Sequence, residues 1–290
     1  MSKSKVIVLG STGMLGHMMS LFLTEKKLDV LGLSRRELKI SGVSNESIDF
    51  DILADSIELI ESYKPDIIIN CIGILNDEAS FDRLQAIKIN SLLPQMISEK
   101  YRDSKTKLIQ ISTDCVFSGL NPPYTEKSTP DGIGDYAWTK ILGEVNNEKD
   151  LTIRTSIIGP DINENGIGLF NWFMRNKHKT LYGYEDIKWT GVTNLELAKL
   201  VFTLMESNIS GLVHLVNNSE ISKFELIKLF NQYFNNGQTV INKDNKKRLS
   251  KVLNSGLDLN SLKIPSYEEM ISELKTWVEE HKSLYKNYFS

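Results

Sequence analysis

Short apolar runs rich in β-branched residues recur along the first two-thirds of this chain. They occupy residues 6–9, 30–33, 67–71, 108–112, 151–155 and 212–216. Runs this apolar are typical of strands buried on both faces, as in parallel sheets covered by helices. The segments between them predict helices over 14–26, 52–63, 81–101 and 136–147. This alternation predicts an α/β fold with a doubly wound parallel sheet.

Composition excludes several classes of protein. Lysines, arginines and carboxylates are interspersed along the 290 residues, and the formal net charge is −3, so we expect no nucleic-acid partner. The two cysteines, Cys71 and Cys115, have no ligand-like spacing to histidine, which predicts neither a disulfide nor a metal site. The chain has no signal-like start and no apolar stretch of membrane-spanning length. We therefore expect a soluble, cytoplasmic protein without a membrane partner.

A glycine-rich turn, GSTGMLGH, follows the first apolar run directly and leads into a predicted helix. Glycine lets a backbone turn tightly and approach a pyrophosphate, and the start of a helix offers unpaired N–H groups to its charge. The spacing of Gly10, Gly13 and Gly16 alone also fits an ordinary turn, but its place between strand and helix favours a dinucleotide site.

The end of the second predicted strand bears on the choice of cofactor. An NAD site would be expected to offer a carboxylate there, whereas this chain has Ser34, Arg35 and Arg36. Two arginines favour the 2′-phosphate of NADPH, with NADH as the alternative. They also fit a solvated turn in which Glu37 neutralises one of them. Further along, Asp51 and Ile52 are candidates to bracket the adenine, although Asp51 fits a helix cap equally well.

Taken together, several stretches resemble the extended short-chain dehydrogenases/reductases, and more narrowly the dTDP-4-dehydrorhamnose reductase group, which reduces 4-keto sugars carried on a nucleotide. The stretches are GSTGMLGH, INCIGI at 69–74, QISTDCVFSG at 110–119, PYTE at 123–126, YAWTKILGE at 136–144 and IRTSIIG at 153–159. Weaker similarity reaches SKFELIKLF and VLNSGLDLNSLKI, so the resemblance spans nearly the whole chain. The combination is specific for the family, and no single element is.

The resemblance implies a Rossmann-like NAD(P)-binding domain over residues 1–155, with core strands continuing to about residue 220. Residues 156–290 would form a smaller, mostly helical, mainly substrate-binding lobe interleaved with the first. Within it, residues 168–176 and 193–207 read as helices, the second capped by Thr193 or Asn194.

The resemblance also implies a role for each matching residue. Cofactor contacts would come from Gly10, Thr12, Gly13, Met14, Leu15, Gly16, Cys71, Ile72 and Gly73, with Asn90 helping to organise the site. Thr113, Tyr136 and Lys140 match the catalytic hydroxyl, tyrosine and lysine. Substrate contacts would come from Thr113, Asp114, Val116, Arg154 and Thr155, and from Trp172 and Trp189, which fit core packing equally well.

Reduction of a ketone requires a proton at the oxygen as negative charge develops there. Tyr136 is the candidate acid, and Lys140 lies on the same face of a helix, where an ammonium is expected to lower the pKa of the phenol. Thr113 would stabilise the same oxygen, although it also fits a turn before Asp114. Dehydratases of the wider family usually place two acids after the threonine, and Cys115 breaks that pair here. Simple reduction is therefore favoured.

These inferences predict NADPH-dependent reduction of the 4-keto group of a nucleotide-linked 6-deoxy-4-keto sugar in surface polysaccharide synthesis. The sugar would be dTDP-4-dehydrorhamnose or a UDP-N-acetyl analogue. The alternatives are a nucleotide-sugar epimerase or dehydratase and a non-catalytic, dinucleotide-binding regulatory subunit. A homodimer is a candidate assembly, and the orientation of Trp138, which bears on the size of the sugar pocket, is open.

Overall fold

The computed structural model describes residues 4–37, 40–217, 219–257 and 262–289. The chain divides into two compact units. The first comprises Met1–Ser118, Thr129–Arg154 and Ala198–Val213, and the second comprises Gly119–Ser128, Thr155–Leu197 and His214–Ser290. The C-terminal stretch of family resemblance, VLNSGLDLNSLKI, includes residues 258–261, which lie outside the described residues. The assignment of 156–290 to substrate binding stays a prediction.

The first unit is built around a seven-stranded sheet, in the order β11-β6-β5-β4-β1-β2-β3. Its strands are β1 (Lys5–Leu9), β2 (Asp29–Ser34), β3 (Ser44–Ser47), β4 (Ile67–Asn70), β5 (Lys107–Ile111), β6 (Leu151–Arg154) and β11 (Gly211–His214). The pairings from β3 across to β6 are all parallel. This confirms the predicted fold class, and each of the six predicted strands is present to within two residues of its expected ends.

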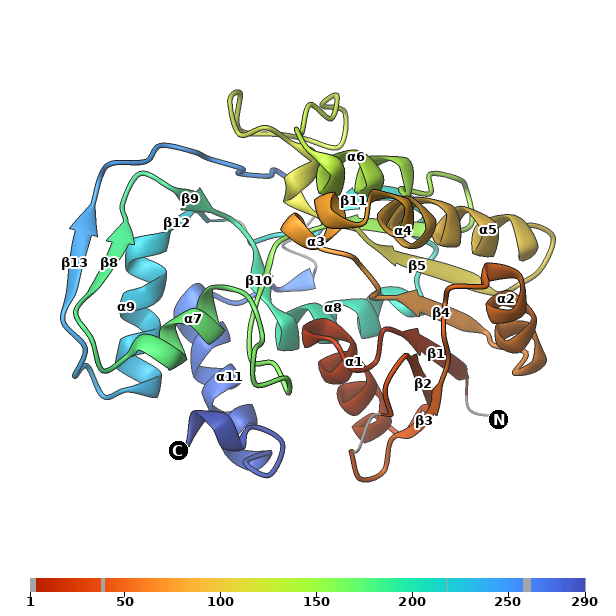
Figure 1. Cartoon of the computed structure of the whole chain (residues 1–290), viewed down its shortest axis with the longest axis horizontal. Helices are drawn as coiled ribbons and strands as arrows, with labels where there is room; N and C mark the ends of the chain where they lie inside the picture. The colour runs from red at the N-terminus through yellow and green to blue at the C-terminus, as the bar shows by residue number, and fades with distance from the viewer. Residues whose placement is uncertain (1–3, 38–39, 218, 258–261, 290) are drawn as a thin grey trace. The chain divides into compact units, whose positions relative to one another are not determined.

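Helices cover both faces of this sheet. They are α1 (Met14–Glu25), α2 (Leu53–Ser62), α3 (Asn76–Phe81), α4 (Arg83–Ala86), the π-helix η1 (Ile87–Leu92), α5 (Leu93–Lys100), the 3₁₀-helix η2 (Asp114–Val116), α6 (Asp135–Leu142) and α8 (Asn194–Met205). Helices α4, α5 and α6 gather on one side of the sheet and α1 with α8 on the other (Figure 1). The rings of Phe22 and Phe202 join α1 to α8, edge to face.

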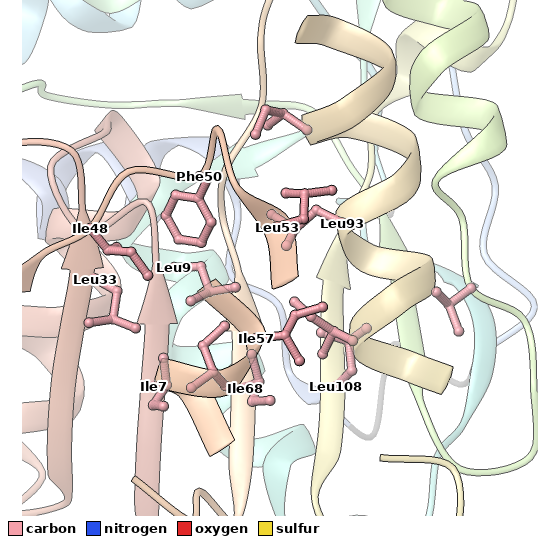
Figure 2. Close-up of a cluster of buried hydrophobic side chains, with 14 of the residues drawn as sticks. Ile7, Leu9, Leu33, Ile48, Phe50, Leu53, Ile57, Ile68, Leu93 and Leu108 are labelled. Carbon is pink, nitrogen blue, oxygen red and sulfur yellow. The ribbon is translucent and has the colours of Figure 1, made fainter. Parts of the chain in front are cut away.

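Aliphatic side chains of the sheet and of two helices interlock to form the core of this unit (Figure 2). Ile7, Ile68 and Leu108 come from neighbouring strands, and Leu53 and Leu93 come from α2 and α5. Burial of each such side chain stabilises the fold by about 1.5–3 kcal/mol. The carboxyl ends of the strands, where the predicted site residues lie, are therefore carried on a rigid base.

The second unit is built from short elements. Its strands pair as β10 (Val192–Thr193) with β7 (Ile157–Ile158), β12 (Ile221–Ser222) with β9 (Lys188–Trp189), and β13 (Ile241–Asp244) with β8 (Leu181–Tyr184). Its helices are α7 (Leu169–Asn176), α9 (Lys223–Phe234), α11 (Tyr267–Glu280) and the 3₁₀-helix η3 (Lys286–Tyr288). Phe170 packs edge to face against Phe230, Phe234 and Tyr288 in its interior.

One of the two candidate caps of the helix predicted over 193–207 is selected by the structure. Helix α8 begins at Asn194, and the Thr193 hydroxyl accepts a hydrogen bond from the backbone N–H of Glu196 at 3.1 Å. Thr193 is therefore the N-cap residue.

Candidate active site

The glycine turn after β1 closes tightly on the start of α1. Gly10 has a φ of +79°, and the Gly13 N–H donates to the Gly10 carbonyl at 2.9 Å. A Cβ placed on Gly16 would lie only 2.0 Å from the same carbonyl oxygen, so only glycine fits there. Gly13 is exposed, Thr12 and Met14 are partly exposed, and Leu15 is buried. The turn therefore presents open backbone at a helix N-terminus, which is the form that a pyrophosphate approaches.

Beyond the carboxyl end of β2 the two arginines lie at the surface. Ser34 is buried, accepts a hydrogen bond from the Ser11 hydroxyl at 3.2 Å and donates to the Arg36 carbonyl at 2.6 Å. Its hydroxyl thus holds the strand end against the glycine turn. The side chains of Arg35 and Arg36 are exposed just past this anchor.

Asp51 and Ile52 are both exposed before α2. The N-cap residue of α2 is Ile52, and no side chain caps this helix. The Asp51 carboxylate instead accepts a hydrogen bond from Gln85 Nε2 at 2.6 Å. The cap interpretation of Asp51 is therefore wrong, and its contact with an adenine ring stays a prediction.

The end of β4 meets the glycine turn of β1. The Cys71 N–H donates to the Leu9 carbonyl at 3.0 Å, and a Cβ on Gly10 would lie 3.0 Å from Ile72 Cγ1. In the strand order, β1 and β4 are the neighbours between which the sheet changes direction, which is where doubly wound folds bind ligands. Ile72 is partly exposed and Gly73 exposed there, while burial raises the pKa of the Cys71 thiol to about 12. That thiol stays protonated and unreactive.

Thr113, Tyr136 and Lys140 converge at the carboxyl end of β5. The Lys140 side chain is 4% exposed, and its ammonium donates to the Ile111 carbonyl at 2.7 Å. The Thr113 hydroxyl lies close enough to the Tyr136 phenol to affect its pKa, and donates to Asp114 Oδ1 at 3.2 Å. It also accepts from the Cys115 N–H at 3.1 Å and so caps η2. Thr113 is therefore both a turn residue and a neighbour of the tyrosine.

The electrostatics of this cluster differ from the expectation for Tyr136. Burial raises the pKa of its phenol, Cys115 and Asp114 raise it further, and only the Thr113 hydroxyl lowers it. Burial also lowers the pKa of Lys140 to about 8. The predicted lowering of the phenol pKa by Lys140 is thus absent from this structure, because desolvation of the phenolate dominates. The lysine ammonium is held by the Ile111 carbonyl.

Asn90 ties the β4 end to the helix that bears the tyrosine. Its side-chain oxygen accepts from the Ile74 N–H at 2.8 Å, and its amide donates to the Ile74 carbonyl at 2.9 Å and to Thr139 Oγ1 at 3.0 Å. Asn90 is buried in the π-helix η1, whose irregular turn the sequence did not predict. Pro94 was the available signal, because it lacks the N–H that would bond the Asn90 carbonyl in a regular helix.

Two residues predicted to touch substrate in the first unit are engaged internally. The guanidinium of Arg154 pairs with the Glu144 carboxylate through Nε at 2.7 Å and Nη2 at 2.6 Å, and lies over the Phe117 ring. Val116 is fully buried, whereas Asp114 is partly exposed. A substrate contact by any of the three stays a prediction.

The other three predicted substrate residues lie in the second unit. Trp189 is buried against Tyr267, with the Lys223 ammonium over its ring. Trp172 is partly exposed on α7. Thr155 is buried, and its hydroxyl has no hydrogen-bond partner among the described residues. Their roles in substrate binding also stay predictions.

The orientation of Trp138 follows from its place on α6. It is 51% exposed and lies two residues after Tyr136, which is about 200° around a helix. Its side chain therefore projects on the side of α6 opposite the tyrosine, and does not border the Tyr136–Lys140 face.

The described residues contain no group of three or more His, Cys, Asp or Glu side chains arranged to hold a metal ion. Within the same residues, no helix has both the length and the apolar character needed to cross a bilayer. His17 and His214 are buried and bonded to backbone carbonyls, in keeping with structural roles.

Proteins similar to this one were found by sequence and by structure. The chain is 26% identical over 253 residues to methionine adenosyltransferase 2 subunit beta of Xenopus tropicalis, covering 80% of this chain and 72% of that protein. It is 23% identical over 232 residues to dTDP-4-keto-6-deoxy-D-glucose reductase of Streptomyces niveus, covering 77% of this chain and 76% of that protein. A crystal structure of dTDP-4-dehydrorhamnose reductase from Bacillus anthracis, in complex with NADP, superposes with a TM-score of 0.79 at 21% identity, covering 96% of this chain and 99% of that one. The model of the RmlD substrate binding domain family matches residues 4–289, and this protein belongs to that family.

Proposed function

We propose that this protein is an oxidoreductase that uses NADPH to reduce the 4-keto group of a nucleotide-linked 6-deoxy-4-keto sugar. The observation that carries the proposal is the convergence of Thr113, Tyr136 and Lys140 at the carboxyl end of β5. That end lies one strand away from the β1–β4 switch point. Membership of the RmlD family and the similarity to a Streptomyces keto-sugar reductase support the same reaction.

The residues around the switch point fit a nicotinamide dinucleotide. The open backbone at Gly13 and the start of α1 suit a pyrophosphate, and the turn at Ile72 and Gly73 lies beside them. The exposed pair Arg35 and Arg36 suits a 2′-phosphate. When bound, reduced nicotinamide supplies the hydride. The complex of the Bacillus anthracis reductase with NADP supports this cofactor class.

In the proposed reaction the chain supplies the proton. Because the pKa of Tyr136 lies above its usual value, the phenol is fully protonated at neutral pH and is available as a donor to the ketone oxygen. Thr113 has a single O–H, which would turn from Asp114 to donate a hydrogen bond to the developing oxyanion. Lys140, charged below about pH 8, would hold the cofactor ribose.

The role of the two arginines can be tested by comparing how tightly NADPH and NADH bind when both are replaced. Removing both side chains, in Arg35→Ala with Arg36→Ala, should weaken NADPH binding about 10²–10⁴-fold, because each of the two charge-assisted hydrogen bonds would contribute about 1.5–3 kcal/mol. NADH binding should change little, since NADH has no 2′-phosphate. Fluorescence titration of both cofactors measures the ratio. Lys105→Ala, which removes an exposed cation of the same unit, is the matched control. Equal losses for both cofactors would contradict the role of the arginines.

A second candidate function is a non-catalytic subunit that binds a dinucleotide. The similarity to proteins named as beta subunits of methionine adenosyltransferase 2, which spans 80% of this chain, favours it. An epimerase or dehydratase is a third candidate, disfavoured by Cys115 at the second acid position. A panel of dTDP- and UDP-linked sugars, in the 4-keto-6-deoxy form with NADPH and in the parent 4-hydroxy form with NAD, separates the three. Stoichiometric loss of NADPH absorbance supports reduction, sugar conversion without NADPH loss supports the third candidate, and binding without turnover supports the second.

We also propose a cytoplasmic location, a place in surface polysaccharide synthesis and a homodimeric assembly. A group of exposed apolar side chains on the first unit supports the homodimer. Phe81 and Leu84 at the α3–α4 junction are 93% and 79% exposed, and Trp138 and Leu142 of α6 are also exposed. An ion pair between Arg83 and Asp135 joins the two segments.

Trp138→Glu should therefore convert a dimer into a monomer, because a carboxylate at a buried apolar contact carries a large desolvation cost. Light scattering after gel filtration measures the mass. Tyr182→Glu, at an exposed aromatic of the second unit, is the control. A wild-type protein that is monomeric at all concentrations would contradict the proposal.

A further inference from the structure

Glu144 lies two residues beyond the end of α6, and its side chain is only 7% exposed. Both carboxylate oxygens are in use. Oε1 accepts from the Ser112 hydroxyl at 2.7 Å and from Arg154 Nε at 2.7 Å, and Oε2 accepts from Arg154 Nη2 at 2.6 Å. A carboxylate this enclosed is retained only where its partners satisfy it, so the position of Glu144 is well defined.

The hydrogen-bond donors to Glu144 lie at the ends of two strands that carry the candidate site. Ser112 directly follows β5 and precedes Thr113, and Arg154 is the last residue of β6. Lys140, four residues before Glu144, donates to the carbonyl of Ile111, the neighbour of Ser112. Lysine and glutamate thus contact successive residues at the end of β5. The segment that presents Tyr136 is therefore fixed against the strand that presents Thr113.

Glu144 also places a negative charge where it raises the pKa of the buried Lys140. Two groups raise the pKa of Lys140 against the effect of burial, Glu144 from its own segment and Cys71 from the end of β4. The Cys71 thiol remains neutral, because burial holds its pKa at about 12. Tyr136 of the same helix is protonated as well, and the β5 end offers Lys140 an uncharged carbonyl. Glu144 is thus the acidic residue among these that favours the charged form of Lys140, and its own counter-cation is Arg154.

We propose that Glu144 is a positioning residue that fixes the tyrosine–lysine helix to the ends of β5 and β6 and keeps the buried Lys140 charged at neutral pH. Its effect on turnover rests on the proposed function. Its effect on the charge of Lys140 does not, and that charge is measurable in the protein without cofactor or sugar.

The test follows the Lys140 ammonium by NMR of protein labelled with ¹⁵N at lysine Nζ, with the signal identified by its loss in Lys140→Met. The wild-type midpoint is expected near pH 8. In Glu144→Gln it should fall by about one pH unit or more, because Glu144 is the stronger of the two groups that raise the pKa of Lys140, and loss of a nearby opposite charge shifts a pKa by about that amount. Glu148→Gln removes the same charge at an exposed site and should leave the midpoint unchanged. An unchanged midpoint in folded Glu144→Gln overturns the proposal.

A second variant separates the effect of the Glu144 charge on Lys140 from the effect of lost packing. It also allows the proposal to be tested if Glu144→Gln does not fold. Arg154→Met breaks the same ion pair but frees the carboxylate, so the Lys140 midpoint should rise, opposite to the change in Glu144→Gln. A purely structural role predicts the same direction in both variants, and a fall in Arg154→Met overturns the proposal. The pH at which NADPH affinity declines should follow the midpoint in each variant. If the wild-type protein reduces no sugar, the proposed function fails while the NMR midpoints still decide the role of Glu144.

Discussion

Replacing Tyr136 with phenylalanine should lower kcat by about 10²–10⁴-fold, which is the usual contribution of a positioned general acid. The variant keeps the ring that packs against the β-sheet core and loses only the hydroxyl that meets Thr113. NADPH affinity should therefore stay within about twofold, and thermal stability should change little. Turnover is followed by the loss of NADPH absorbance with the preferred keto sugar, and affinity by cofactor fluorescence.

Tyr182→Phe is the matched control, since it removes the hydroxyl of an exposed tyrosine in β8. It should retain wild-type kcat. Wild-type turnover in Tyr136→Phe would exclude the phenol as the proton donor and with it the proposed mechanism. A protein that binds NADPH but turns over no sugar in either form would favour the subunit interpretation.

The strands that carry the site could be predicted because their burial leaves a strong signal. Strand β4 is the run IIIN, buried along its whole length, and its short length and β-branched residues favour a buried strand. Strand β3 is the opposite case. Its sequence, SNES, is mostly exposed at the edge of the sheet, so neither hydrophobicity nor alternation marks it. The two-residue strands of the second unit are too short to show any period.

Helix ends were predicted less well than helix positions, for local reasons. The predicted helix over 136–147 ends at Leu142, because Gly143 occupies the C-cap and the following asparagines belong to the loop. Asn147, for example, hydrogen-bonds the Asp150 carboxylate through its side chain at 3.0 Å. Side chains that bond nearby backbone or loop groups compete with helix continuation.

For the site, the spacing of residues along one helix could be used to predict which side chains share a face. The contacts between one helix or strand and another could not be predicted in this way. The four-residue separation of Tyr136 and Lys140 predicts a shared face, and the same arithmetic places Trp138 on the other side. The hydrogen bond from Lys140 to the Ile111 carbonyl joins residues 29 apart in the sequence. The pairing of Arg154 with Glu144 likewise depends on how α6 meets β6. No local pattern predicts either contact, so the electrostatics of the tyrosine and lysine required the structure.

The glycine turn allows a prediction that separates folding from cofactor binding. A methyl group on Gly16 would lie 2.0 Å from the Gly10 carbonyl oxygen and 2.6 Å from its carbon. Backbone atoms cannot move aside as a flexible side chain can, so α1 would have to shift away from the turn. Gly16→Ala should therefore lower the free energy of unfolding by about 1–3 kcal/mol or more and abolish measurable NADPH binding. Urea denaturation and cofactor fluorescence measure the two effects.

Gly13→Ala, three residues earlier, should separate those effects. Its Cβ would lie 3.4 Å from the nearest heavy atom, the Gly10 carbonyl oxygen, and its φ of −83° suits any residue. Stability should therefore change by no more than about 0.5 kcal/mol. NADPH affinity should nevertheless fall, because the methyl group would occupy the exposed backbone that a pyrophosphate approaches. If Gly13→Ala bound NADPH as tightly as the wild type, the turn would be a structural connection between β1 and α1, and the dinucleotide site would have to be sought elsewhere on the sheet.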